Sequence, residues 1–190
     1  GMQILQTQQF APSRGSQQWL GDGVYFWTEV IEAYRWIRSP WEREIRKKKL
    51  DPAQFRLIDH YCILQAKVST AHARVFDLTT QKHRTAFDRM LQLMKEKVKR
   101  GRLGDKEVAE TVVLNHMFQR LKFSEDYDLV LMSFPRQFHK YADFVTRIGF
   151  IWQCQICVKN TAIIADIAEY PLSTALHELE EQAALYTAVV

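Results

Sequence analysis

The sequence predicts an α+β protein. Its β-rich segments fall early and late in the chain, and two long segments in the middle have the spacing of amphipathic helices. Apolar residues make up 47% of the 190 residues, which is enough to bury one core. The chain has neither an internal repeat nor a linker rich in Pro, Gly and Ser. We therefore expect a single domain over residues 2–190, with Gly1 read as the remnant of a removed tag.

The N-terminal part predicts a loop, a strand and a helix. Residues 12–16 have loop composition, and the short aromatic run at 23–27 favours a strand. Thr28 has the residue type of a helix N-cap, and apolar residues then recur at helical spacing over residues 29–38. Because the position before a proline disfavours helix, we expect this helix to end ahead of Pro40.

The rest of the chain predicts strands on either side of two helices. One helix should span residues 81–99 and a second residues 105–122. Their expected buried faces are formed by Phe87, Met90, Leu91 and Met94 in the first and by Val108, Val112, Met117 and Leu121 in the second. The β-rich segments at 61–69, 74–78, 128–134, 150–159 and 162–167 predict strands. A Rossmann fold is disfavoured, because Gly21-x-Gly23 precedes a strand and not a helix.

Cysteine content and hydropathy exclude several classes of protein. No apolar run reaches the roughly 18–20 residues that span a bilayer, and no secretory signal opens the chain. Cys62, Cys154 and Cys157 leave one thiol unpaired in any disulfide scheme, which suits the cytoplasm. Cys154 and Cys157 have the spacing of zinc ligands, but no second pair follows and a strand would send them to opposite faces. We expect a cytoplasmic protein without a bound metal and without a membrane partner.

The segment Trp-Leu-Gly-Asp-Gly-Val-Tyr-Phe at 19–26 contains the candidate ligand-binding residues. Glycines such as Gly21 and Gly23 let the backbone approach a ligand closely, and the face of Tyr25 can stack on a flat ring. With Ile4-Leu5 and Phe10-Ala11-Pro12 before it and Ala33-Tyr34-Arg35-Trp36 after it, this segment resembles the poly(ADP-ribose) polymerase-like ADP-ribosyltransferases, which have a loop, a Gly-x-Gly-[Ile/Val]-Tyr-Phe strand and a helix in this order.

The resemblance implies both a fold and a ligand. The fold is a mixed, mainly antiparallel split β-sheet of the ADP-ribosyltransferase type with a central helical insertion. The ligand is NAD, bound as the substrate, with its nicotinamide held by Gly21, Gly23 and Tyr25.

The late strand carries the catalytic position that the resemblance implies. The family opens this strand with Glu in the pattern Glu-x-[Ile/Val]-Val, and here Gln155 stands in that place before Ile156-Cys157-Val158. A carboxylate there would stabilise the positive charge that grows on the ribose as nicotinamide leaves. Gln155 can hydrogen-bond the ribose without supplying that charge, so we expect transfer to be weaker, altered or absent. Alternatively, its amide satisfies backbone groups at the strand start.

A further signature of the family falls outside this chain. The family places a His followed by Gly and Ser or Thr on a strand ahead of the segment that corresponds to Ile4-Leu5, and the chain begins after that point. None of its six histidines matches the motif. We expect either that the start of the protein lies upstream or that the site is incomplete.

The sequence supports two functions. The first is an ADP-ribosyltransferase-like protein that binds NAD or an NAD-like nucleotide and transfers ADP-ribose to a macromolecular acceptor, as a toxin or a defence effector would. The second is an inactive module of the same fold that binds protein or nucleic acid through the basic residues at 43–49 and 95–106. The net charge of +4 predicts only weak attraction to nucleic acid.

Overall fold

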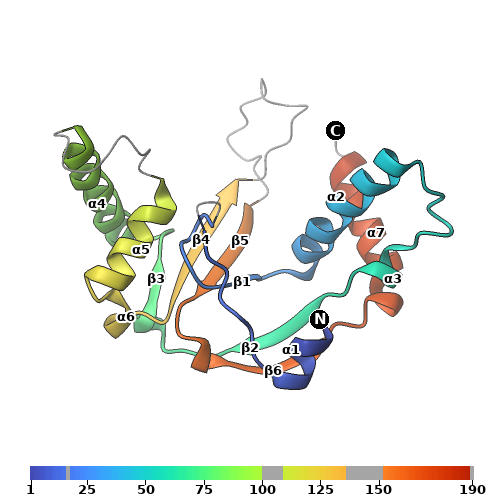
Figure 1. The fold of residues 1–190 in the computed structure, drawn as a ribbon, viewed down its shortest axis with the longest axis horizontal. Coiled ribbons are helices and arrows are strands. Elements are labelled where there is room, and N and C mark those ends of the chain that lie inside the picture. Colours follow the sequence, from blue (N-terminus) through green and yellow to red (C-terminus); the bar gives the residue numbers. More distant parts are fainter. Residues whose placement is uncertain (16–17, 100–108, 136–151, 189–190) are drawn as a thin grey trace. The chain divides into compact units, whose positions relative to one another are not determined.

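The computed structural model describes residues 1–15, 18–99, 109–135 and 152–188. The chain forms two compact units, each built from segments that are distant in sequence. The four-stranded unit comprises Phe10–Phe26 and Ser69–Ile163, and the two-stranded unit comprises Gly1–Gln9, Trp27–Val68 and Ile164–Val190. Both contain helices and strands, and antiparallel pairing predominates in the sheets (Figure 1). The predicted α+β class is confirmed, whereas a single domain over 2–190 stays a prediction.

A mixed sheet forms the centre of the four-stranded unit. Its strands are ordered β1, β5, β4, β3. Their bounds are Val24–Trp27 for β1, Trp152–Val158 for β5, Leu129–Pro135 for β4 and Val75–Asp77 for β3. Strand β4 runs parallel to β3 and antiparallel to β5. The strands predicted at 23–27 and 150–159 therefore both form and are neighbours in one sheet, with residues 150–151 outside the described part of the chain.

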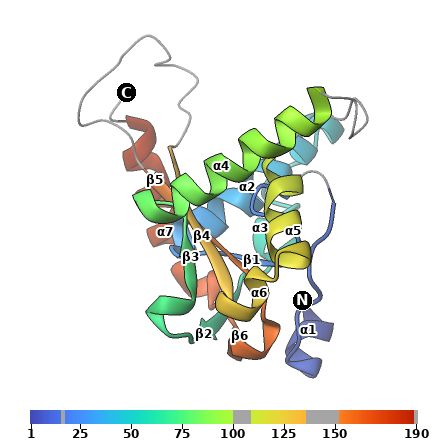
Figure 2. The same ribbon diagram turned by 90° about the vertical axis from the view of Figure 1, so that its left-hand side faces the viewer.

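Helices α4 (Gln81–Lys99) and α5 (Glu110–Arg120) pack against each other in this unit, and the short α6 (Phe123–Asp126) follows α5 (Figure 2). Their buried side chains join those of the strands in one core, which contains Leu20, Phe76, Leu78, Phe87, Met94, Val113, Leu114, Met117, Phe118, Val130 and Cys157. Single 3-10 turns at His72–Arg74 and Thr161–Ile163 lead into β3 and β6. The sheet face beneath α4 and α5 is thus the one that faces the core.

The two central helices test the predicted helical faces. Helix α4 has the predicted bounds, and its predicted face is the one that packs on the core: Phe87 and Met94 are buried, and Met90 and Leu91 are partly buried against the same core. The start predicted for α5, at residue 105, and Val108 of its predicted face lie outside the described residues. Its predicted face was wrong in part: Val112 and Leu121 are each 44% exposed, and Leu114 is buried in their place. Apolar residues occur on several sides of α5, so spacing alone did not identify the buried one.

Asp128 joins three segments of the four-stranded unit. Its carboxylate accepts hydrogen bonds from Nε and Nη2 of Arg74 at 2.7 and 2.9 Å, from Thr70 Oγ1 at 2.5 Å and from Asn160 Nδ2 at 2.9 Å. Its backbone carbonyl accepts from the N–H groups of Lys159 and Asn160. The side chain is buried, and the hydrogen bonds from Arg74 hold the pKa of this carboxyl well below its usual range. Asp128 therefore ties the end of β5 to the entry of β3 and β4.

The two-stranded unit consists of an antiparallel pair and four helices. Strand β2 (Leu64–Val68) pairs with β6 (Ile164–Glu169), and the helices are α1 (Met2–Thr7), α2 (Val30–Lys48), α3 (Leu57–His60) and α7 (Leu172–Ala188). The core of this unit contains Tyr34, Leu57, Ile63, Leu172, Leu179 and Ala183. Helix α1 is held by Gln8, whose side-chain amide donates to the carbonyl of Ile167 at 3.0 Å and accepts from its N–H at 3.2 Å.

The predicted end of α2 was wrong. The helix continues through Pro40 to Lys48, and its N-cap is Glu29 and not Thr28. Proline removes one backbone donor, but the apolar stripe carries on beyond it. Trp41 packs against the core of the two-stranded unit and donates its indole N–H to the carbonyl of Phe55 at 2.9 Å. These contacts extend the helix past a residue that usually ends one.

Candidate functional site

The structure places the predicted site residues on two neighbouring strands. Gly21, Gly23 and Tyr25 lie in the turn and strand of β1, and Gln155 lies on β5 beside it. A Cβ built on Gly23 would lie 2.5 Å from Cys157 Sγ, so both residues use the same sheet face. Because side chains alternate along a strand, Tyr25 shares this face with Gly23, and Gln155 shares it with Cys157. The fold thus brings Tyr25 and Gln155 to one face of the sheet.

The hydroxyl of Tyr25 is engaged by its own turn. It accepts a hydrogen bond from the backbone N–H of Leu20 at 2.9 Å and donates one to the carbonyl of Gly21 at 2.6 Å. Burial, and then the neighbouring Cys157, raises the pKa of Tyr25 far above its ordinary value. The phenol therefore stays protonated, and it fixes the shape of the glycine turn.

Lys159 holds the same turn from the end of β5. Its ammonium group donates to the carbonyls of Leu20 and Asp22, at 2.6 Å in each case, and lies 5.2 Å from the ring centroid of Phe118. Burial lowers the pKa of Lys159. Sequence reasoning missed this residue. The available signal was its position two residues after Cys157, which places it on the same face of a largely apolar strand.

The two glycines are required by close contacts within the chain. Gly21 has φ +76°, and a Cβ there would lie 2.6 Å from Oδ1 of Asn115. A Cβ on Gly23 would lie 2.7 Å from the carbonyl oxygen of Val158. Asn115 also accepts from the N–H of Asp22 at 2.7 Å and donates to its carboxylate at 3.0 Å. The close approach predicted from these glycines is thus made to α5 and β5, and the sequence carried no signal for the role of Asn115.

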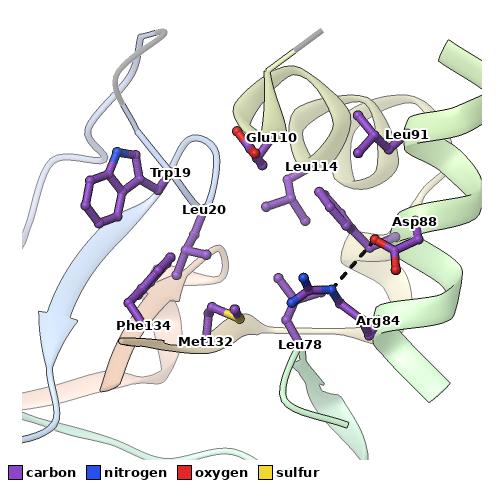
Figure 3. Close-up of a pocket in the computed structure, with 11 residues that line it drawn as sticks. Trp19, Leu20, Leu78, Arg84, Asp88, Leu91, Glu110, Leu114, Met132 and Phe134 are labelled. Atoms are coloured by element: carbon purple, nitrogen blue, oxygen red, sulfur yellow. Dashed lines mark ion pairs between the residues drawn. The ribbon is translucent and has the colours of Figure 1, made fainter. Parts of the chain in front are cut away.

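An apolar cavity of about 420 Å³ lies on the core-facing side of this sheet (Figure 3). Trp19 and Phe134 form one wall, with ring centroids 5.1 Å apart, and the Arg84–Asp88 ion pair, 3.7 Å long, lies on the side formed by α4. The other lining residues are Leu20, Leu78, Phe87, Leu91, Glu110, Leu114 and Met132. The volume lies within the range of about 300–1,000 Å³ that is typical of small-molecule sites.

Gln155 does not line this cavity itself, but it pairs with a residue that does. It is directly opposite Met132 in the β4–β5 pair, so both side chains are on the sheet face that lines the cavity. Within the described part of the chain, the Gln155 carboxamide makes no hydrogen bond. The amide therefore makes no hydrogen bond to a backbone group of any described residue, which is what the alternative role for Gln155 would require. Its donor and acceptor are free to meet a ligand.

The described residues contain neither a membrane-spanning helix nor a set of metal ligands. No helix among them is both long enough and apolar enough to cross a membrane. In the same residues, no three His, Cys, Asp or Glu side chains gather as a set of metal ligands. Cys157 is buried on the core face of β5, and Cys154, three residues before it, projects to the other face.

Comparison with known proteins identifies a relative. No family model and no solved structure matches the chain. The chain is 31% identical over 188 residues to the uncharacterised protein MJ0359 of Methanocaldococcus jannaschii, and the alignment covers 91% of this chain and 83% of that protein. At this identity and coverage, the chain belongs to the same protein family as MJ0359.

Proposed function

We propose that this chain is an ADP-ribosyltransferase-like protein that binds NAD or an NAD-like nucleotide, with the nicotinamide ring in the apolar cavity and Gln155 at its edge. One observation carries the proposal: the carboxamide of Gln155 has no hydrogen bond to any described residue, and Gln155 shares its sheet face with Tyr25 and pairs with Met132, which lines the cavity. This arrangement offers a surface for a flat ring and a hydrogen-bonding group next to it. The order of loop, strand and helix around Tyr25 supports the ADP-ribosyltransferase type of fold.

The chemistry of the cavity suits the nicotinamide of NAD. The ring is flat and carries a positive charge, which favours contact with aromatic faces such as those of Trp19 and Phe134. Glu110 lies at the cavity and makes no ion pair with any described residue, so it can offset this charge. Trp19 is 55% exposed, which leaves much of its indole open to a ligand.

Gln155 at the proposed catalytic position is better suited to binding NAD than to cleaving its glycosidic bond. Transfer breaks the bond between the ribose C1′ and the nicotinamide nitrogen, the bonding electrons leave with nicotinamide, and a nucleophile of the acceptor bonds to C1′. Positive charge builds on the ribose during this step, and a carboxylate would stabilise it. Gln155 can orient a ribose hydroxyl but supplies no negative charge. We therefore propose slow or absent transfer together with measurable binding.

Calorimetric titration with NAD and with free nicotinamide tests this proposal. Trp19→Ala should weaken the binding of both ligands about two- to tenfold, because an aromatic pair contributes roughly 0.5–1.5 kcal/mol beyond its buried area. Trp19→Phe should retain most of the affinity. Leu93→Ala, on an exposed part of α4 outside the cavity, serves as the control. If the wild-type protein does not bind NAD at millimolar concentration, or if Trp19→Ala binds as tightly as wild type, the proposal is wrong.

The second candidate is an inactive module of the same fold that binds protein or nucleic acid. Two observations favour it: the Tyr25 hydroxyl and the glycine turn are engaged by the chain itself, and basic side chains are exposed on two helices. These basic residues are Lys95, Lys97 and Lys99 on α4 and Arg46, Lys47 and Lys48 on α2. A nucleic-acid affinity that falls steeply with salt, without any NAD affinity, would support this candidate over the first.

A further inference from the structure

The four-stranded unit contains a second cavity of a different character. Its volume is about 590 Å³, and it is lined by Pro12, Arg14, Asp22, Gly23, Asn115, Phe118, Gln119, Ser124 and Lys159. These residues are largely polar, and none of them lines the apolar cavity. A cavity with polar groups at fixed positions is suited to a ligand that is itself polar.

Backbone pairing places a cation opposite an anion at this cavity. Ser13 and Gly23 form an antiparallel bridge, with Ser13 N–H donating to Gly23 O at 2.8 Å and Gly23 N–H donating to Ser13 O at 3.1 Å. Arg14 and Asp22 are the next residues on the two sides of this bridge, and both line the cavity. Arg14 nevertheless forms no ion pair with Asp22 or with any other described residue. Its guanidinium retains its donors for a ligand.

The carboxylate of Asp22 is held in a fixed position. It accepts from Asn115 Nδ2 at 3.0 Å and from Gln119 Nε2 at 3.4 Å, while the backbone N–H of Asp22 donates to Asn115 Oδ1. A carboxylate has about four acceptor sites, so these two bonds leave capacity for further donors. The hydroxyl of Ser124 donates to the carbonyl of Phe118 at 3.2 Å, and its oxygen can still accept.

The charges on the two sides of this cavity restrict the class of ligand. A simple anion would be attracted by Arg14 and Lys159 but repelled by Asp22, and a simple cation would be attracted by Asp22 but repelled by Arg14 and Lys159. A molecule with an anionic group at one end and hydroxyl donors at the other satisfies both sides. Arginine binds phosphate with two parallel hydrogen bonds, and a carboxylate accepts readily from neighbouring hydroxyls.

We propose that this polar cavity binds a small phosphorylated sugar, with the phosphate on Arg14 and the hydroxyl groups on Asp22. The proposal rests on the placement of Arg14 and Asp22, and it does not depend on the binding of NAD in the apolar cavity. Each of the two cavities then binds a different ligand.

Titration calorimetry with ribose 5-phosphate, ribose and inorganic phosphate tests this proposal. Ribose 5-phosphate should bind most tightly, and Arg14→Ala should weaken its binding about tenfold, as expected for the loss of charge-assisted hydrogen bonds to phosphate. Arg120→Ala is the matched control, because Arg120 is exposed on α5 and does not line the cavity. Both arginines are exposed, so neither change should alter folding, which the thermal midpoint checks.

Three results would overturn the proposal. These are the absence of binding at millimolar concentration, equal affinity for inorganic phosphate and ribose 5-phosphate, which would indicate an adventitious ion only, and an unchanged affinity in Arg14→Ala. The two sites are separated by their variants: Trp19→Ala should leave ribose 5-phosphate binding intact, and Arg14→Ala should leave nicotinamide binding intact. Failure of nicotinamide binding alone would therefore reject the proposed function and not this inference.

Discussion

Replacing Asp128 with alanine is expected to destabilise the four-stranded unit by about 3 kcal/mol. The carboxylate accepts four hydrogen bonds, two of them from Arg74, and it is 3% exposed. Removing one partner of a buried ion pair typically costs about 3–5 kcal/mol, because the other partner keeps an uncompensated charge. The side chain of Arg74 is 41% exposed, so water can solvate it once Asp128 is gone. The expected loss is therefore at the lower end of that range.

The same residue should contribute to the acid sensitivity of the protein. Hydrogen bonds from Arg74 lower the pKa of Asp128 in the folded state, so the folded protein resists protonation here more than the unfolded chain does. An unfolded Asp takes up its proton near pH 4. The stabilisation by Asp128 is therefore complete above about pH 5 and declines as the pH falls below about 4 toward the folded pKa. Asp128→Ala should lack this part of the decline.

Urea denaturation followed by circular dichroism, between pH 3 and pH 7, measures both effects. Asp126→Ala is the control, because Asp126 is an exposed acidic residue two positions away. A midpoint for Asp128→Ala equal to that of the control would refute the reasoning, since the hydrogen bonds would then contribute nothing net. An acid-induced loss of stability identical to that of the wild type would show that other carboxylates cause it.

Three further changes test the glycine turn and the proposed catalytic position. Gly23→Ala should destabilise the protein by about 1–3 kcal/mol, since its Cβ would lie 2.7 Å from a backbone oxygen of β5, and a wild-type urea midpoint would contradict this contact. Tyr25→Phe removes the hydroxyl that accepts from the N–H of Leu20 and donates to the carbonyl of Gly21 and should cost about 1–3 kcal/mol, whereas Tyr61→Phe should be nearly neutral. Under the proposed function, Gln155→Glu supplies the carboxylate that the resemblance implies and should raise nicotinamide release from NAD about tenfold or more, and no release from this variant would count against a transferase site.

The local sequence pattern was sufficient to predict a helix when its own residues determine where it begins and ends. Helix α4 could be predicted to its end residues, because one apolar stripe runs along its length and no proline interrupts it. Helix α2 could not, since it continues beyond Pro40, where Trp41 contacts Phe55, 14 residues further along the chain. Local rules describe the average effect of a proline, and tertiary packing decides the individual case.

The sequence predicted only those residues of the candidate site that belong to the recognised motif. The positions of Tyr25 and Gln155 on strands followed from the sequence, whereas the adjacency of these strands and the engagement of the Tyr25 hydroxyl by the turn did not. Lys159 and Asn115 lie 139 and 93 residues from their partners in the turn, and no local spacing connects such positions. Both cavities combine side chains from several elements, so they become visible only once the chain is folded.

The contact between Gln8 and Ile167 has a consequence for self-association. Among the described residues, β6 pairs with β2 alone, and the N–H and carbonyl of Ile167 bond to Gln8 on its other edge. Such an edge is a template on which a strand of another molecule can pair, which is a common route to aggregation. The side-chain amide of Gln8 presents a donor and an acceptor as a peptide group would, and it occupies this position. The primary amide of one glutamine thereby blocks the open edge at the point where an incoming strand would have to pair.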